Sequence, residues 1–265
     1  ELDNFLGYNS NFTIYDTSDS QVVIKAALKA LNLDDKYYPV GAMLSAISDA
    51  KNKLMFASDY RKQARDFYQQ KVADVYEYYE RELRKNNALD FDDLLLVAVK
   101  LLQSNAAVLD KYSKRFKYVM IDEYQDTNKS QFTLVKMLAE VNQNITVVGD
   151  NDQGIYSFRG ADISNILNFE RDFPGTKIIK LEQNYRSTHR ILHCANILID
   201  NNEHVFDKKL FSNLGEGEKL QVIEAKNEEH EAERIVAELI AHRFSRKTKF
   251  KDYAILYRGN HQSRL

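Results

Sequence analysis

The chain of 265 residues has a single cysteine, no excess of charge of either sign and no long apolar run. One cysteine, Cys194, excludes an internal disulfide and fits a reducing compartment. No stretch of about 18 apolar residues and no secretory signal is visible, so we expect a soluble, cytoplasmic protein without membrane contact. Lys and Arg number 37 against 39 Asp and Glu, so any site for a polyanion has to be a local groove.

The first third of the chain has the pattern of helices. With 44% hydrophobic residues the chain can bury a core, and its length suggests one to two domains. Asp16 supplies a helix cap, Pro39 opens a second helix, and a long charged helix is expected over 58–86. We therefore predict an all-helical unit over residues 16–87.

From residue 88 onward the pattern changes to alternating strands and helices. Asp90 can cap the first of these helices. Such alternation predicts an α/β protein with a parallel sheet. The expected strands are 117–121, 145–148, 177–181, 220–225 and 253–257, and the expected helices are 130–140, 162–172, 187–201 and 228–243.

The stretch 117–126 carries the first candidate site. A short apolar run, Val119–Ile121, ends directly on Asp122 and Glu123. Open α/β sheets bind ligands at the carboxyl ends of their strands. One carboxylate can hold Mg²⁺ beside a phosphate, and its neighbour can orient or deprotonate an attacking water. An isolated Asp-Glu after a strand is more often a solvated turn, but the neighbouring motifs favour the site.

The next strand ends in a polar loop that carries Gln153, followed by two aromatic residues and an arginine. Gln153 could reach a terminal phosphate or the attacking water, although an ordinary turn explains the loop equally well. Tyr156 and Phe158 could stack on the bases of a single strand, at about 1–3 kcal/mol each. The alternative is that both rings plug the core and Arg159 pairs with an acid.

Two further segments combine rings or arginines with the ends of expected strands. Tyr185 suits a purine base, and Arg186 suits a phosphate oxygen or the charge that develops in phosphoryl transfer. A tyrosine lining the sheet and a surface arginine are the alternative. At the chain end Arg258 and Arg264 could hold phosphates, or could belong to a solvated tail.

A pair of histidines four residues apart on one helix could bind a metal. His189 and His193 stand beside Cys194, but the residues between the histidines include no glutamate base. We interpret the pair as helix packing.

Five segments in matching order and spacing resemble the superfamily 1 DNA helicases of the UvrD/PcrA/Rep type. The resemblance covers nearly the whole chain, is weakest over 16–87, and is closest to the Rep branch at the chain end. The segments are residues 90–95, 119–128, 148–160, 181–188 and 253–264.

This resemblance implies a RecA-like P-loop NTPase fold with incomplete parallel sheets and an all-helical insertion. Residues 1–15 would end the N-terminal part of RecA-like domain 1A, and 16–87 would be the helical 1B insertion. Residues 88–186 would be the remainder of 1A, and 187–265 the start of RecA-like domain 2A.

The resemblance also implies ATP and Mg²⁺ as cofactors. Asp122 would hold Mg²⁺, and Glu123 would activate water against the γ-phosphate of ATP. Gln153 would sense that phosphate, and Arg186 would contact it. Tyr185 would stack on adenine.

Single-stranded DNA and duplex junctions are the implied partners, together with possible replication or repair proteins. Tyr156 and Phe158 would stack on bases, and Arg159 would link the DNA loop to the catalytic acids. Contacts to the DNA backbone are implied for three residues at the chain end, Arg258, Asn260 and Arg264.

The chain departs from the family pattern in several places. It has no Gly-x-x-x-x-Gly-Lys-Ser/Thr loop, whose amides and lysine cradle phosphates, and the late family motifs would lie beyond Leu265. Phe158 stands where tryptophan is frequent, and Gly154 where serine is usual. We therefore expect a piece, inactive alone, of a 3′→5′ ATP-dependent DNA helicase. A DNA-binding or partner-binding module without chemistry, and the motor of a helicase–nuclease, remain as alternatives.

Overall fold

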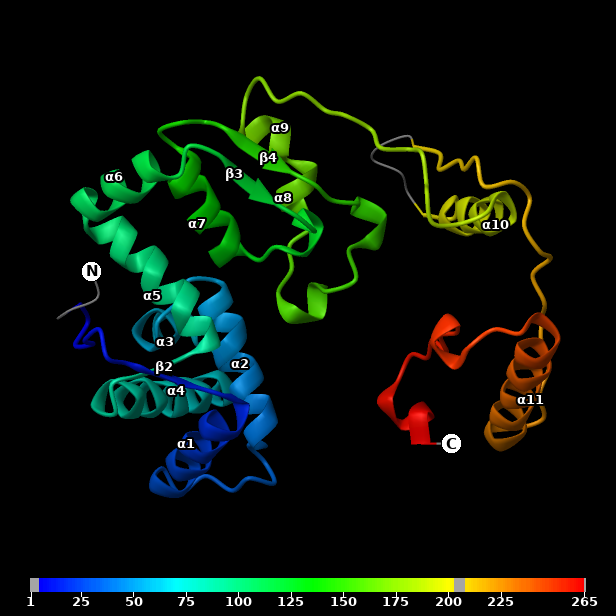
Figure 1. Ribbon diagram of the computed structural model, residues 1–265. Coiled ribbons are helices and arrows are strands. Elements are labelled where there is room, and N and C mark those ends of the chain that lie inside the picture. Colours follow the sequence, from blue (N-terminus) through cyan, green and yellow to red (C-terminus); the bar gives the residue numbers. More distant parts are fainter. Residues whose placement is uncertain (1–4, 203–207, 265) are drawn as a thin grey trace. The chain divides into compact units, whose positions relative to one another are not determined.

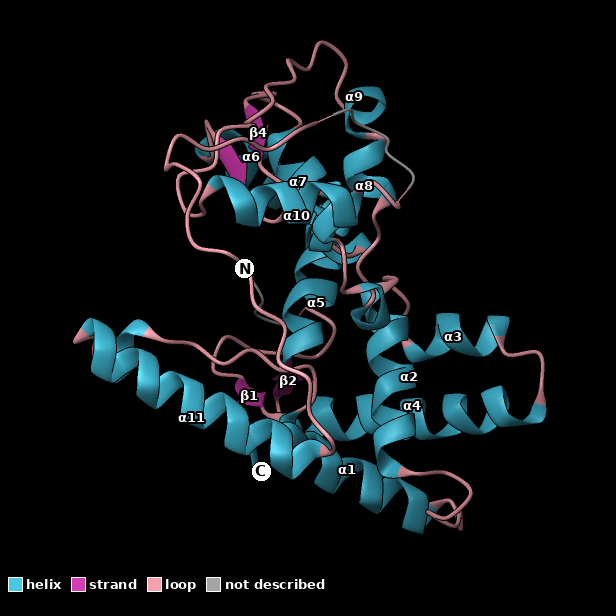
Figure 2. Ribbon diagram, turned by 90° about the vertical axis from the view of Figure 1, so that its right-hand side faces the viewer, coloured by secondary structure: helices cyan, strands magenta, loops and turns pink. Residues whose placement is uncertain are grey.

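The computed structural model of the chain describes residues 5–202 and 208–264. The chain forms two compact units, Glu1–Ile178 and Ile179–Leu265 (Figure 1). No helix in the described part of the chain combines the length and apolar character needed to cross a bilayer. Strands are few and short, and they stand out among the helices in Figure 2.

The first half of the first unit is a pair of strands with four helices inserted between them. The strands are parallel, and Thr13 pairs with Ala88 and Tyr15 with Asp90. The chain therefore leaves this sheet and returns beside its starting point. The elements are β1 (Thr13–Tyr15), α1 (Thr17–Ala30), α2 (Val40–Asn52), α3 (Ala57–Gln63), α4 (Phe67–Lys85) and β2 (Ala88–Asp90).

The predicted long helix over 58–86 is wrong, because the chain breaks between α3 and α4. Asp66 has an extended backbone, and its side chain accepts the N–H of Gln69 at 2.7 Å. A new helix start costs little when an aspartate satisfies one of its free N–H groups. Five residues of α4 recur at helical spacing, and four of them are buried, Val72, Val75, Tyr79 and Leu83, whereas the fifth, Tyr68, is 43% exposed.

A buried lysine joins α2 to the beginning of α5 (Phe91–Ser104). Lys51 Nζ lies 2.6 Å from Asp90 Oδ2 and 2.8 Å from Asp93 Oδ1. Burial raises the pKa of the Asp93 carboxyl to about 7, and the nearby Asp90 adds to the rise while Lys51 opposes it. Burial also acts on Asp90, but the Lys51 ammonium outweighs it and holds the pKa of Asp90 below its ordinary value. This ion cluster joins α2, in the helical segment between β1 and β2, to the end of β2 and the start of α5.

The second half of the first unit contains the predicted parallel strands. Val119 pairs with Ile145, and Ile121 with Val147, so β3 and β4 run side by side in the same direction (Figure 1). The elements are α6 (Ala106–Arg115), β3 (Val119–Ile121), α7 (Lys129–Ala139), β4 (Ile145–Val147), α8 (Ser164–Leu167) and α9 (Phe169–Asp172). The expected helix 162–172 is therefore two short helices that meet at Asn168. Mixed helices with small parallel sheets confirm the α/β class.

The second unit contains α10 (His189–Ile199) and α11 (Glu228–Arg246), close to the two predicted helices. The strands predicted at 177–181, 220–225 and 253–257 are wrong for this structure, which has no named strand in the described part of this unit. A strand needs a neighbour to satisfy its backbone groups, and these segments have no ladder partner. Exposed apolar side chains mark them, with Val222 96% and Leu256 93% exposed.

Candidate functional site

The end of β3 presents two exposed carboxylates on a tight turn. Glu123 has φ 50° and ψ 43°, in the left-handed region that few non-glycine residues adopt. Its N–H donates to Asp122 Oδ1 at 2.9 Å. The turn lets the next N–H, that of Tyr124, donate to the carbonyl of Val148 at 2.9 Å. Functional sites are common places for such backbone strain.

The neighbouring strand β4 ends in the loop that carries Gln153. Asp150 Oδ2 accepts the side-chain amide of Gln153 at 2.8 Å. Gly149, which precedes Asp150, has no room for a side chain. A Cβ at this residue would lie 2.7 Å from Gln125 Oε1 and 2.8 Å from Ile166 Cδ1. The loop is thus packed closely against the segment that follows β3.

Gln125 connects the two loops. Its side chain is buried, Nε2 donates to Glu123 Oε2 at 2.8 Å, and Oε1 accepts the N–H of Asp150 at 3.0 Å. Glu123 and Gln153 are therefore joined through Gln125 and Asp150 in one chain of hydrogen bonds. The structure brings together two of the predicted catalytic residues, as expected for parallel strands that end at the same edge.

The exposed acids fit a magnesium ion that is shared with a phosphate. Mg²⁺ in proteins keeps waters and uses one or two carboxylates plus phosphate oxygens. Asp122 is exposed, with one oxygen oriented by the N–H of Glu123. Within residues 5–202 and 208–264 no group of three or more His, Cys, Asp or Glu side chains is arranged to hold a metal ion by itself. The donor set therefore fits Mg²⁺ bound with a nucleotide better than a metal site built from protein alone.

The aromatic loop after Gln153 lies at the surface. Phe158 is 75% exposed and Tyr156 is 38% exposed, so neither ring plugs the core. Their centroids are 5.9 Å apart, and the guanidinium of Arg159 lies over both rings, at 5.3 Å from Tyr156 and 5.5 Å from Phe158. Two open rings beside a planar cation form a surface on which nucleobases can stack.

This aromatic loop is tied to the segment that follows Glu123. Thr127 is the anchor: its carbonyl accepts the N–H of Asp162 at 2.9 Å and the side-chain amide of Asn165 at 3.0 Å. The hydroxyl of Thr127 in turn donates to the carbonyl of Tyr124 at 2.7 Å. Thr127 is therefore a shared support for the turn after the two acids and for the residues that follow the aromatic loop.

The helical part of the unit also contacts this support. Asn128 caps α7 by accepting the N–H of Gln131, and its own amide donates to Asn52 Oδ1 at 2.7 Å. Ser130 Oγ donates to the carbonyls at the end of α2, Lys51 and Asn52, each at 3.0 Å. The end of α2 thus joins the buried ion cluster to the start of α7.

The remaining predicted site residues belong to the second unit. Tyr185 is 78% exposed, and its hydroxyl donates to Gln183 Oε1 at 3.0 Å. Arg186 is exposed, and its N–H donates to Asn184 Oδ1 at 2.9 Å. Arg258 is exposed as well. The side chains of two more predicted residues, Asn260 and Arg264, lie outside the described part.

The histidine pair shows surface stacking. The rings of His189 and His193 are 6.4 Å apart and nearly parallel, and both side chains and Cys194 are exposed. The predicted packing role is therefore limited to contact between the two rings.

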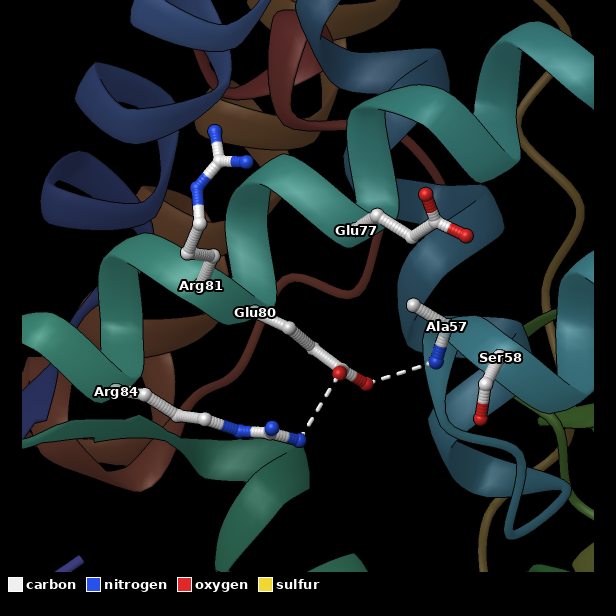
Figure 3. Close-up of a pocket in the computed structure, with 6 residues that line it drawn as sticks. All are labelled: Ala57, Ser58, Glu77, Glu80, Arg81 and Arg84. Atoms are coloured by element: carbon white, nitrogen blue, oxygen red, sulfur yellow. Dashed lines mark hydrogen bonds and ion pairs between the residues drawn. The ribbon is translucent and has the colours of Figure 1, made fainter. Parts of the chain in front are cut away.

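A hollow of about 340 Å³ between α3 and α4 contains none of the predicted site residues. Figure 3 shows the Glu80 carboxylate between the N–H of Ala57, at 2.7 Å, and the guanidinium of Arg84, at 3.1 Å. Burial raises the pKa of Glu80, opposed by the hydrogen bond from Ala57. The bond from Ala57 joins α3 to α4 at Glu80, whereas Arg84 lies on the same helix as Glu80. The hollow is lined by Ala57, Ser58, Glu77, Glu80, Arg81 and Arg84.

Comparison with known proteins defines the class of this chain. Residues 2–174 match the UvrD/REP helicase N-terminal domain, and residues 179–265 match the UvrD-like helicase C-terminal domain. The chain belongs to the UvrD/REP helicase family.

Similar proteins include ATP-dependent DNA helicase Rep of Escherichia coli strain K12, which is 50% identical over 260 residues. Rep of Salmonella typhimurium is 49% identical, and ATP-dependent DNA helicase PcrA of Staphylococcus aureus is 48% identical. Each match covers 98% of this chain, but only 38% of either Rep and 36% of PcrA. The chain spans little more than a third of the length of these relatives.

Two residues of the site were missed by sequence reasoning. Gln125 stands inside the Asp-Glu-Tyr-Gln-Asp run, and its place two residues after Glu123 was the available signal. Lys51 gave no signal, because lysine is rarely buried and its two aspartates lie far along the chain.

Proposed function

We propose that this chain is part of an ATP-dependent DNA helicase that moves 3′→5′ on single-stranded DNA. The observation that carries the proposal is the hydrogen-bonded connection from Glu123 through Gln125 and Asp150 to Gln153. The proposed base Glu123, the proposed phosphate sensor Gln153 and the exposed aromatic loop are then connected through neighbouring residues of the first unit. The similar proteins Rep and PcrA, both ATP-dependent DNA helicases, agree with this function.

The proposed domain layout follows the family. Residues 1–15 and 88–186 belong to RecA-like domain 1A, 16–87 form the 1B insertion, and 187–265 begin domain 2A. The return of the chain to its own sheet after α4 supports an insertion between β1 and β2. The compact units divide at Ile178, earlier than residue 186.

On the nucleotide side, each residue has a separate task. Asp122 would hold Mg²⁺, which neutralises charge on the phosphates when it is bound. Glu123 would accept a proton from the attacking water, and its position at the end of β3 leaves the carboxylate accessible. Gln153 would hydrogen-bond the γ-phosphate or the water. Tyr185 would stack on adenine, and Arg186 would stabilise the charge that develops on the γ-phosphate.

On the DNA side, the exposed rings would separate successive bases. Tyr156 is 38% exposed and Phe158 is 75% exposed, and the Arg159 guanidinium lies over both rings. Arg159 would link this DNA loop to the catalytic acids. Movement of this loop after hydrolysis would shift the strand. Backbone contacts beyond the loop are proposed for Arg258, Asn260 and Arg264.

The test of the chemistry is Glu123→Gln in the full-length protein, with DNA-stimulated ATP hydrolysis as the readout. The amide keeps the shape of the carboxylate but cannot accept a proton, so we expect kcat to fall by about 10²–10⁴ while ATP still binds. Glu140→Gln, at the exposed end of α7, is the matched control and should leave kcat unchanged. Hydrolysis that persists in Glu123→Gln removes this residue from its role.

The test of the DNA loop is fluorescence anisotropy of a labelled single-stranded oligonucleotide. Loss of one stacked ring, Tyr156→Ala or Phe158→Ala, should weaken binding roughly 5-fold to 150-fold, since stacking contributes about 1–3 kcal/mol per base. The control is Tyr37→Ala, which removes a ring that is 70% exposed outside the loop. Equal affinity of all variants defeats the stacking assignment.

A further inference from the structure

A buried glutamine amide lies between the two halves of the proposed nucleotide site. Gln125 is 1% exposed, and both ends of its amide are used. Nε2 donates to Glu123 Oε2 at 2.8 Å, and Oε1 accepts the N–H of Asp150 at 3.0 Å. The first bond holds the proposed base, and the second holds the loop after β4.

The partners of this amide fix its direction. A carboxylate only accepts hydrogen bonds and a backbone N–H only donates, so the amide nitrogen must face Glu123 and its oxygen must face Asp150. In a reversed amide, the oxygen of Gln125 would face the carboxylate oxygen of Glu123, and its NH₂ group would face the N–H of Asp150, so neither hydrogen bond could form. The amide is therefore a directional link between the ends of β3 and β4.

The surrounding residues keep Gln125 in this position. Gly149 leaves the space for Oε1, because a Cβ at this residue would lie 2.7 Å from that atom. The preceding Tyr124 is fully buried and packs edge-on against Phe169, with ring centroids 5.4 Å apart. The close packing around Gln125 and Tyr124 therefore restricts this segment and keeps the amide of Gln125 beside Glu123 Oε2.

We propose that Gln125 is a positioning residue for Glu123, and that it links the proposed base to the loop that carries Gln153. The inference rests on the proposed function. With Oε2 of Glu123 held by Gln125, the other carboxylate oxygen is directed towards the attacking water. The bond from Gln125 to Asp150, which binds Gln153 at 2.8 Å, makes the orientation of the base depend on the position of the phosphate-sensing loop.

The experiment measures ATP hydrolysis by the full-length protein carrying Gln125→Met or Gln125→Glu, with and without single-stranded DNA. Met keeps the length of the side chain and removes both hydrogen bonds. We expect kcat to fall by about 10-fold to 100-fold with little change in the KM for ATP, because a displaced catalytic group costs rate more than binding. Stimulation by DNA should fall as well, since the loop and the base are no longer connected.

Gln125→Glu tests the two hydrogen bonds separately, because it keeps one and removes the other. Its carboxylate still accepts the N–H of Asp150, but it replaces the donor to Glu123 by a like charge. We expect the kcat of this variant to be low also, and the acid limb of its pH–rate profile to move to higher pH, because a second carboxylate favours the protonated form of the base. A residue that only supports the fold would not move this limb.

Gln131→Met is the matched control. Gln131 stands in the same region, and its Oε1 accepts the N–H of Asn128 at 3.0 Å, in the capping box of α7. Its loss should lower the melting temperature without changing kcat or the pH profile. Circular dichroism verifies that each variant is folded, and Gln125→Glu carries the test if Gln125→Met does not fold.

The outcomes separate this inference from the proposed function. A wild-type protein without DNA-stimulated hydrolysis, or an active Glu123→Gln variant, overturns the proposed function and the inference with it. An inactive Glu123→Gln together with a wild-type kcat and pH profile in the Gln125 variants overturns the positioning role alone. Low kcat, an unchanged KM and a shifted acid limb support it.

Discussion

Replacing the buried lysine of the ion cluster should strongly destabilise the first unit. Lys51 is 1% exposed and lies 2.6 Å from Asp90 and 2.8 Å from Asp93, which are themselves nearly enclosed. In Lys51→Met the methionine fills most of the volume of the lysine, so packing is largely kept. The two carboxylates, however, lose their counter-charge in a place that water cannot reach.

The magnitude follows from that burial. Breaking a buried ion pair by removing one partner costs about 3–5 kcal/mol. Domains have free energies of unfolding of about 5–15 kcal/mol, so a large part of the stability is lost. Because burial raises the pKa of Asp93 to about 7, this carboxyl can take up a proton, and the cost of Lys51→Met should be smaller below that pH than above it. Urea denaturation followed by circular dichroism, on either side of neutral pH, measures both effects.

The matched control is two residues further along the chain, at the exposed end of α2. Lys53 forms an ion pair with Asp49 at 2.7 Å, but the two side chains are 57% and 52% exposed. Lys53→Met should therefore cost less than about 1 kcal/mol. The reasoning is refuted if Lys51→Met and Lys53→Met unfold at the same urea concentration.

Three further predictions concern the same unit. As pH rises from about 5 to about 8, the free energy of unfolding of the wild type should fall relative to that of Asp93→Asn. The pKa of Asp93 is about 7 in the folded protein, above its value in the unfolded chain, so the stabilisation by the protonated carboxyl is lost as pH rises through this pKa. A constant difference between the two denaturation midpoints contradicts this. Gly149→Ala should displace Gln125 and lower both the melting temperature and the rate of ATP hydrolysis. Gly41→Ala in α2 is the control, because its Cβ would meet nothing within 4 Å, and it should stabilise the protein by about 0.5–1 kcal/mol. Equal effects of the two substitutions in calorimetry refute the close-packing argument. Asn128→Ala removes the cap of α7 and should cost about 0.5–2 kcal/mol in urea denaturation, and an unchanged midpoint shows that the cap is dispensable.

Local signals in the sequence were sufficient for several helix starts, although not for that of α4, and for the parallel pair. Asp16 and Asp90 both form capping boxes with the aspartate three residues later, as the pattern of polar residues before an apolar stripe indicates. The apolar run Val119–Ile121 pairs in parallel with the next predicted strand. Such features depend on residues that are near one another in the chain, so the sequence alone identifies them.

Features that depend on distant residues could not be predicted. The strand expected at 220–225 has suitable residues but no neighbour to bond with. The burial of Lys51 depends on two aspartates about forty positions away, and the role of Gln125 depends on Asp150 in another loop. The local geometry within single motifs was therefore accessible from sequence, and the links between motifs required the fold.

The most direct test of the central claim is a crystal structure of the full-length protein with Mg²⁺ and a non-hydrolysable ATP analogue. We expect a magnesium ion bound to Asp122 at about 2.0–2.1 Å. Glu123, Gln153 and Arg186 should then all face the γ-phosphate. A nucleotide bound elsewhere, or a γ-phosphate that none of these side chains faces, would contradict the account.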